Sequence, residues 1–194
     1  MTVNLEKISE SSQILASLFR LDVSKNSELA SAIRSLNEGE WPINLSDRED
    51  EAKLKVAFEL LHKGLEPNQL ESLHEEYNRL FVGPVTLPCP PWGSVYLDKD
   101  KVIFGTSTLD LRDWMKANGI SLNLEMNEPE DHIGLMLIMI STLAGDAKEK
   151  QLSEILNNHF YPWIYNYLDC LEKSTTHDFY RGLAKLSQVT LKSW

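Results

Sequence analysis

The sequence predicts an all-α protein, a compact bundle of many helices that carries one long ordered loop rich in proline and glycine. Two observations lead to this prediction. Apolar residues recur at spacings of three and four along most of the 194 residues, which places them on one face of a helix. A strand is needed nowhere, apart from one optional short pairing between the segments around Tyr96 and Ile103.

The first part of the chain is expected to form several helices. Gly39 and Gly64 stand just after two of the apolar stripes, where glycine commonly ends a helix. Pro67 fits the first turn of a further helix, because the N–H that proline lacks would have no helical partner there. The expected helices follow the stripes 8–19, 29–36, 54–61 and 67–81.

The segment from Val82 to Lys101 interrupts this pattern. It contains four prolines and two glycines, so neither a helix nor a central strand fits it. A loop of this length is commonly either functional or disordered. Trp92 and its apolar neighbours argue against a disordered linker. We therefore expect an ordered loop that packs on the body of the protein.

Helices resume after the loop. Thr106 and Ser107 are typical of a helix start, and Pro162 is expected to bend the longest helix. The run IGLMLIMI (133–140) is apolar on every side and predicts a central buried helix. The expected helices are 106–119, 128–145, 148–171 and 177–194.

The chain is expected to form a single domain spanning residues 1–194. An alternative division gives an N-terminal half, 1–125, and a C-terminal half, 126–194, that share one core. A helical protein with long connecting loops is expected to be a monomer or a domain-swapped dimer.

The charge balance restricts the classes of partner. With 19 basic and 29 acidic side chains the formal charge is −10, which disfavours binding to nucleic acid or to anionic membrane surfaces. A basic partner would instead be attracted. The longest apolar run, Ile133–Gly145, is shorter than the roughly 20 residues that a membrane span needs, so no stable membrane insertion is expected.

The two cysteines, Cys89 and Cys170, lie 81 positions apart and match neither a C-x-x-C nor a zinc-finger spacing. We therefore expect no disulfide framework, and this usage suits a reducing cytosol. The N-terminus is polar and acidic rather than a secretory signal. Together these features predict a cytoplasmic protein.

The motif EPEDH (128–132) is the strongest candidate for chemistry. If Pro129 lies in the first turn of a helix, then Glu128, Asp131 and His132 share one side of it. An acid beside an imidazole suits general acid–base catalysis. The same residues could also provide two or three ligands for a metal ion. However, zinc sites recruit three or four ligands, and no H-E-x-x-H spacing is present.

Capping is the simplest alternative for these acids, since a carboxylate at a helix N-terminus contributes about 0.3–1 kcal/mol. It explains His132 poorly, because a cation is better placed at the other end of a helix. No glycine-rich phosphate loop and no G-x-S-x-G elbow occurs. Capping, a binding surface and catalysis all remain open from the residues alone.

Two segments carry a family resemblance. YNRLFVGPVTLPCPPWGSVYLD (77–98) and NEPEDHIGLMLIMI (127–140) resemble the TorD/DmsD family of twin-arginine signal-peptide-binding chaperones, and PPWGSVYLD favours its DmsD branch. FGTSTLDLRDWMKANGI and the C-terminal segment that begins HFYPWIYNYLD extend the similarity over roughly 70–194. The first sixty residues match in helical pattern alone.

The resemblance implies a cytoplasmic, all-α, TorD-like chaperone with no catalytic chemistry, cofactor or metal of its own. Its ligand would be the twin-arginine leader of a molybdopterin-dependent reductase of the dimethyl sulfoxide reductase type, held so that export waits for cofactor insertion and folding. Contacts with Tat translocase components are a further expectation. By matching position, the leader-binding residues would be Tyr77, Leu80, Phe81, Pro91, Trp92, Gly105, Asp131 and His132.

At Tyr77 the DmsD branch tends to carry tryptophan, so this chain departs from the family pattern there. The residue chemistry adds Glu128, because a basic leader needs carboxylates for its guanidinium groups. Leu80, Phe81, Trp92 and Tyr96 could form an aromatic and apolar wall for its hydrophobic region. Plain core packing is the competing interpretation of this group, above all for Leu80 and Tyr96.

His132 has two hypothetical roles. It could pair with Asp131 or Glu128 and fix the loop against the helix start, or it could donate to a backbone carbonyl of the leader. Two other functions stay open: a small metal- or nucleotide-dependent hydrolase that uses Asp131 and His132, and a chaperone for another molybdoenzyme such as a trimethylamine N-oxide or nitrate reductase.

Overall fold

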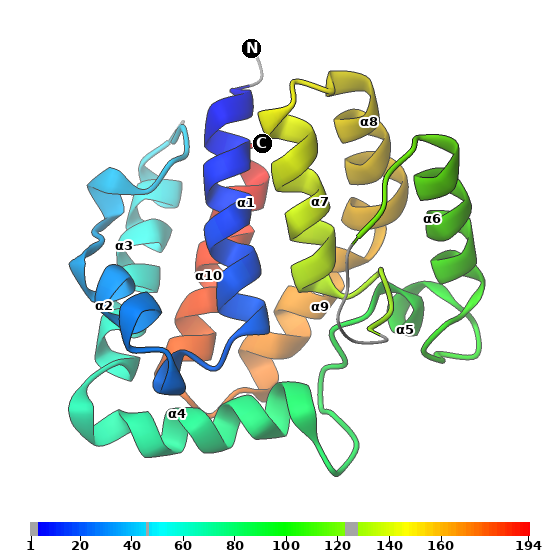
Figure 1. The fold of residues 1–194 in the computed structure, drawn as a ribbon. Coiled ribbons are helices and arrows are strands. Elements are labelled where there is room, and N and C mark those ends of the chain that lie inside the picture. Colours follow the sequence, from blue (N-terminus) through cyan, green and yellow to red (C-terminus); the bar gives the residue numbers. More distant parts are fainter. Residues whose placement is uncertain (1–3, 46, 123–127) are drawn as a thin grey trace.

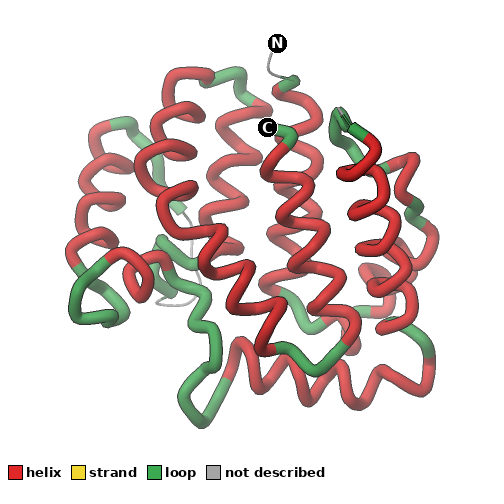
Figure 2. Tube along the Cα trace, turned by 180° about the vertical axis from the view of Figure 1, so that it is seen from behind, coloured by secondary structure: helices red, strands yellow, loops and turns green. Residues whose placement is uncertain are grey.

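The computed structural model describes residues 4–45, 47–122 and 128–194, and its regular secondary structure over these residues is helical (Figures 1 and 2). This confirms the all-α prediction. The α-helices are α1 (Leu5–Arg20), α2 (Ser27–Ser35), α3 (Arg48–Gly64), α4 (Leu70–Tyr77), α5 (Gly93–Leu97), α6 (Thr106–Ala117), α7 (Ile133–Gly145), α8 (Glu149–Glu154), α9 (Tyr161–Ser174) and α10 (Asp178–Lys192). Short 3₁₀ helices are η1 (Val23–Lys25), η2 (Glu38–Glu40) and η3 (Pro67–Gln69), and π-helical segments are η4 (Asn78–Val82) and η5 (Ile155–Phe160).

Helices from the two ends of the sequence pack in pairs. α1 lies along α7, and α3 lies along α10, which also packs against α9 (Figure 1). α4 runs across one end of the bundle, and the C-terminus lies at the opposite end beside the first turns of α1 (Figure 1). There the indole N–H of Trp194 donates to Ser11 Oγ at 3.1 Å. The expected boundary between residues 125 and 126 lies outside the described residues.

The central helix of the core is α7, as its composition predicts. Ten of its 13 residues are buried, including Met136 and Met139. A helix that is apolar on every side can lose this much water contact only when other helices surround it. Its position therefore places its first turn, and the EPEDH segment before it, against the middle of the bundle.

No helix within the described parts of the chain is both long enough and apolar enough to cross a membrane.

The Pro/Gly-rich segment contains a helix that the sequence interpretation missed. Gly93–Leu97 forms α5, since the prolines end at Pro91 and the N–H of Ser94 donates to the carboxylate of Asp131 at 2.7 Å. A Cβ at Gly93 would lie 2.8 Å from Nε1 of Trp163, so glycine allows α5 to pack closely on α9. Because Tyr96 is helical, the optional strand pairing with the region of Ile103 was wrong.

The start of α7 is also corrected. The helix begins at Ile133, not at Glu128, because His132 has extended backbone angles and its Nδ1 accepts the N–H of Gly134 at 3.1 Å. The preceding residues pair with another segment of the chain instead of forming a first turn. Glu128, Asp131 and His132 therefore do not share one face of a helix.

The prediction against a disulfide was wrong as well. Cys89 and Cys170 form a disulfide, with their Cα atoms 5.8 Å apart. The two cysteines are far apart in the sequence but close in space, because α9 packs beside the Pro/Gly-rich segment. The bond attaches this segment to α9, and the cysteines no longer support the argument for a reducing compartment.

The long helix predicted over 148–171 is interrupted rather than simply bent. The π-helical segment η5 separates α8 from α9, and Pro162 occupies the first turn of α9. Proline lacks the N–H that would continue the helical hydrogen bonds, which accounts for the irregular turn directly before it.

Candidate functional site

Two segments that lie about forty residues apart in the sequence meet at the start of α7. The N–H of Ile133 donates to the carbonyl of Pro91 at 2.9 Å, and the N–H of Gly93 donates to the carbonyl of Asp131 at 3.1 Å. Trp92 and His132 thereby form an isolated antiparallel β-bridge. The bridge brings the PPWG and EPEDH motifs to one place.

Trp92 is the more accessible of the two bridge residues, since His132 is buried. It is half-buried, and its indole N–H donates to Oε1 of Glu128 at 2.5 Å. Its ring stands edge-on to the imidazole of His132, with centroids 6.0 Å apart. The indole is thus held in a fixed orientation beside a carboxylate that is itself half-buried.

Asp131 connects three helices instead of facing solvent. It is 4% exposed, and its Oδ2 accepts the N–H of Ser94 at 2.7 Å and the hydroxyl of Thr108 at 3.1 Å. These bonds tie α5 and α6 to the start of α7. Its Oδ2 is therefore engaged inside the protein, and its Oδ1 is buried without a hydrogen-bond partner among the described residues, so the carboxylate is not presented to a guanidinium in solution.

His132 is a neutral helix cap. Burial, with a smaller contribution from the charge of Arg20, lowers the pKa of its imidazole to about 4. At neutral pH its Nδ1 is therefore free to accept the N–H of Gly134. This resolves why a histidine stands at a helix N-terminus: it carries no charge there, and its cap bond is with backbone rather than with Asp131 or Glu128.

The expected apolar wall divides into core and surface. Leu80 is 1% exposed and belongs to the core, as the packing interpretation holds. Phe81 is half-buried, and its ring contacts those of Tyr77 and Tyr180 at centroid distances of 5.4 and 5.5 Å. Tyr96 stacks on Trp163 at 5.9 Å. Phe81 and its neighbour Tyr77 thus keep an accessible part, while Tyr96 is largely committed to packing.

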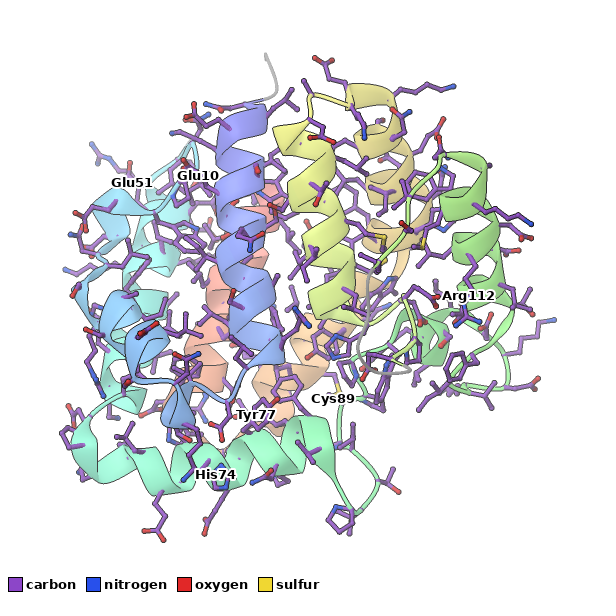
Figure 3. The ribbon with its side chains drawn as sticks, viewed as in Figure 1. Glu10, Glu51, His74, Tyr77, Cys89 and Arg112 are labelled. Carbon is purple, nitrogen blue, oxygen red and sulfur yellow. A yellow bond between two sulfur atoms is a disulfide. The ribbon has the colours of Figure 1, made fainter. Side chains whose placement is uncertain are left out.

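Tyr77 contacts the end of α1. Its hydroxyl donates to the carbonyl of Arg20 at 2.9 Å, and Figure 3 places it between α1 and α4. The side chain of Arg20 in turn covers Gly134, where an added Cβ would lie 2.3 Å from its Cγ. Arg20 therefore links Tyr77 to the His132 cap. No local pattern in the sequence indicates this residue, since it reaches the site only through the packing of α1 on α7.

Pro91 and Gly105 shape the backbone of the site. Pro91 is buried, and its carbonyl accepts the bond from Ile133. At Gly105 an added Cβ would overlap the carboxylate of Asp98, which accepts the N–H and hydroxyl of Ser107 at 3.2 and 3.0 Å. The start of α6 is thus capped by Asp98 from outside the helix, and not by Thr106 or Ser107.

The described residues contain no group of three or more His, Cys, Asp or Glu side chains that could hold a metal ion. A small cavity of about 90 Å³ lies beside Asp131 and is also lined by Asp110, Leu111 and His159. It has the size for water or a small polar group rather than for a nucleotide. The geometry therefore does not favour the hydrolase alternative.

Comparison with known proteins identifies the family to which the chain belongs. A family model described as "Nitrate reductase delta subunit" matches residues 47–169. The "Tat proofreading chaperone DmsD" of Salmonella paratyphi A is 40% identical over 157 residues, which cover 81% of this chain and 72% of that protein. The "Probable Tat proofreading chaperone DmsD" of Haemophilus influenzae is 43% identical over 155 residues, 80% of this chain and 72% of that protein.

These matches define the class of the protein: the chain belongs to the TorD/DmsD family of chaperones. Its place within the family follows from a more distant relative. The "Chaperone protein TorD" of Shewanella pealeana is 23% identical over 188 residues, 93% of this chain and 85% of that protein. The chain thus shares more with the two DmsD proteins than with this TorD protein, and the resemblance noted in its motifs is confirmed.

Proposed function

We propose that this protein is a cytoplasmic Tat proofreading chaperone. It binds the twin-arginine leader of a molybdopterin-dependent reductase of the dimethyl sulfoxide reductase type, and it delays export until the cofactor is inserted and the enzyme has folded. The observation that carries the proposal is the bridge between Trp92 and His132, which joins the two family motifs into one surface.

The leader-binding surface we propose consists of the accessible parts of Tyr77, Phe81, Trp92 and Glu128. A leader is basic and then apolar, so it needs a carboxylate and an aromatic face close together. Trp92 and Glu128 provide this pair directly. Leu80, Pro91, Gly105, Asp131 and His132 then act as positioning residues that hold this surface in place.

The proposal makes the protein a binding protein without chemistry of its own, and the whole chain, 1–194, a single functional domain. The packing of α1 on α7 and of α3 on α10 supports the single domain, because each pair joins the first part of the chain to the last. A monomer suffices for binding. A domain-swapped dimer, contacts with Tat translocase components and a trimethylamine N-oxide or nitrate reductase client remain alternatives for experiment.

The decisive test is calorimetric titration of the protein with a synthetic dimethyl sulfoxide reductase leader, beside a copy in which both arginines are glutamine. The proposal predicts saturable binding of the first and at least about tenfold weaker binding of the second, since charge-assisted bonds are worth about 1.5–3 kcal/mol. Equal binding of both peptides would leave the carboxylates out of recognition. Absence of binding to this and to other molybdoenzyme leaders would contradict the proposal.

A matched pair of tryptophan variants locates the surface. Trp92 and Trp114 each donate an indole N–H to a glutamate, Trp92 to Glu128 and Trp114 to Glu154. Trp92→Phe and Trp114→Phe therefore remove the same bond at two places. We expect the first to weaken leader binding several-fold and the second to leave it unchanged, with folding of both checked by circular dichroism.

A further inference from the structure

An exposed apolar strip lies beside the proposed leader-binding surface. It follows the loop from α5 to α6 and the first turn of α6. Five large apolar side chains there are between 38% and 54% exposed, namely Leu97, Val102, Ile103, Phe104 and Leu109. Large contiguous apolar surface on a soluble protein commonly marks a binding site.

Phe104 is held on this strip in an unfavourable conformation. Its φ is +65°, in the left-handed region that a bulky L-residue rarely adopts, yet the residue is 49% exposed and does not belong to the core. Backbone strain of this kind is concentrated at functional sites. Core packing therefore does not account for the position of this ring.

Arg112 of α6 occupies the space between Phe104 and the EPEDH motif. Its guanidinium carbon lies 5.2 Å from the centre of the Phe104 ring, and its Nε–H donates to Oε2 of Glu130 at 2.6 Å. The side chains of Arg112 and Glu130 are 40% and 20% exposed, so the ion pair is partly accessible to solvent. Figure 3 places Arg112 at the outer edge of α6. A guanidinium is thus held between an aromatic ring and a carboxylate at the surface.

We propose that Glu130 and Phe104 form a subsite for one arginine of the leader, and that Arg112 occupies this subsite in the free protein. The inference rests on the proposed function. An aromatic ring and a carboxylate together select a planar guanidinium, which stacks and donates hydrogen bonds at once, over the compact ammonium of lysine. Arg112 makes these contacts from within the chain, and a leader arginine would replace it.

The residues on either side of the subsite match the order of a leader, which is basic first and then apolar. Glu130 lies two residues after Glu128, and Glu128 accepts the indole N–H of Trp92. The subsite therefore continues the proposed surface. On its other side, Phe104 is part of the apolar strip. A chain that places an arginine on Glu130 can therefore continue with its hydrophobic region over Ile103 and Leu109. Release of Arg112 leaves its charge exposed on α6, so the competition lowers affinity without blocking the site.

The test compares two variants that remove the same charge from the same helix. Arg112→Gln frees the subsite, whereas Lys116→Gln removes an exposed α6 cation for which the described residues show no ion pair. Both proteins become more acidic by one charge, so general attraction of the basic leader changes equally. We expect Arg112→Gln to bind the twin-arginine leader about threefold to fivefold more tightly than Lys116→Gln, the range of an exposed ion pair.

Two further variants test the walls of the subsite. Glu130→Gln is expected to weaken leader binding about tenfold, and Phe104→Leu, which keeps the apolar surface, about threefold. A leader whose arginines are replaced by lysine should bind wild type more weakly than the twin-arginine leader does. For Phe104→Leu the difference between the two leaders should be small, because the ring that favours arginine is absent. All variants are compared by titration after their unfolding midpoints have been measured.

The outcomes separate the subsite from the proposed function. If wild type prefers the twin-arginine leader to its glutamine copy, but Arg112→Gln and Lys116→Gln bind equally and Glu130→Gln keeps the full arginine dependence, then the subsite is wrong and the function stands. If wild type binds the leader and its glutamine copy equally, then the subsite is wrong and the leader is recognised without its arginines. If wild type binds neither this leader nor those of other molybdoenzymes, then the proposed function is wrong as well. Tighter binding by Arg112→Gln together with weaker binding by Glu130→Gln establishes the subsite.

Discussion

The helices α7 and α10 are capped in the same way at their N-termini, but different residues pack around the two caps. At each start a buried histidine precedes the helix, and its Nδ1 accepts the N–H of the second helical residue: His132 from Gly134 at 3.1 Å, and His177 from Phe179 at 3.2 Å. Burial lowers the pKa of both imidazoles, so both act as neutral acceptors. The shared device is therefore structural, and its presence alone does not make His132 a binding residue.

The two starts differ in what packs against them. At α10, the backbone of Phe179 lies against Gly64 of α3, and the nearby carboxylate of Glu76 is held by Arg79 and Thr175. Burial raises the pKa of Glu76, but the bonds from these neighbours outweigh it and lower the pKa to about 2. At α7, by contrast, a flexible arginine side chain covers Gly134, and the half-exposed Trp92 lies beside the cap. One start is locked into the core and the other adjoins an accessible surface.

The largest expected effect is acid destabilisation through His132. Its folded pKa is about 4 and its ordinary value 6.5, so between these pH values the unfolded chain binds a proton that the folded protein excludes. The stability it contributes is present above pH 6.5 and is lost as the pH falls towards 4, by about 3 kcal/mol. Urea unfolding at a series of pH values should show this loss, and His132→Asn should remove most of it. An unchanged pH dependence in that variant would show that other groups cause the loss.

Glycine substitutions test the packing difference. An added Cβ at Gly64 would lie 2.5 Å from the backbone N of Phe179, which cannot move without shifting α10, so Gly64→Ala is expected to cost about 2 kcal/mol. At Gly134 the obstacle is the flexible side chain of Arg20, and Gly134→Ala is expected to change stability by less than about 1 kcal/mol. Unfolding midpoints in urea measure both, and equal losses would contradict the contrast between a rigid and an adaptable helix start.

Cap replacements separate stability from binding. His132→Leu and His177→Leu each remove a cap acceptor and are expected to cost about 1 kcal/mol, while the asparagine variants keep most of it. In the proposed function only His132→Leu also weakens leader binding, because it removes the ring against which Trp92 is held. If both leucine variants bind the leader like wild type, then His132 has no part in the binding surface.

The smallest expected effect comes from Arg20→Gln. The charge of Arg20 helps to lower the pKa of His132, so its removal should raise that pKa slightly and reduce the acid-dependent loss by about 0.5 kcal/mol or less. Arg20 does not contribute to the lowered pKa of His177. Titration of the two imidazole resonances by NMR should therefore show a change for His132 alone, and a parallel change in both would point to a general loosening of the fold.

The sequence by itself determined the helical architecture. The periodic apolar stripes predicted α1, α3 and α10 because helix formation depends on residues three and four positions apart. The all-round apolar composition of 133–140 predicted that α7 is buried. The family motifs could also be read directly, since they consist of particular residues at short spacings. These are local properties, so they need no knowledge of the fold.

Only the tertiary structure decided which distant residues meet. The disulfide between Cys89 and Cys170, the contact of Arg20 with Gly134 and the position of Arg112 between Phe104 and Glu130 each join separate helices or loops. The same reason explains the wrong start of α7: the hydrogen bonds of Asp131 and Ile133 to Gly93 and Pro91 keep His132 extended where the local sequence favours a first helical turn. Contacts through space override local preference there, and they turn Asp131 from a surface acid into a buried link between three helices.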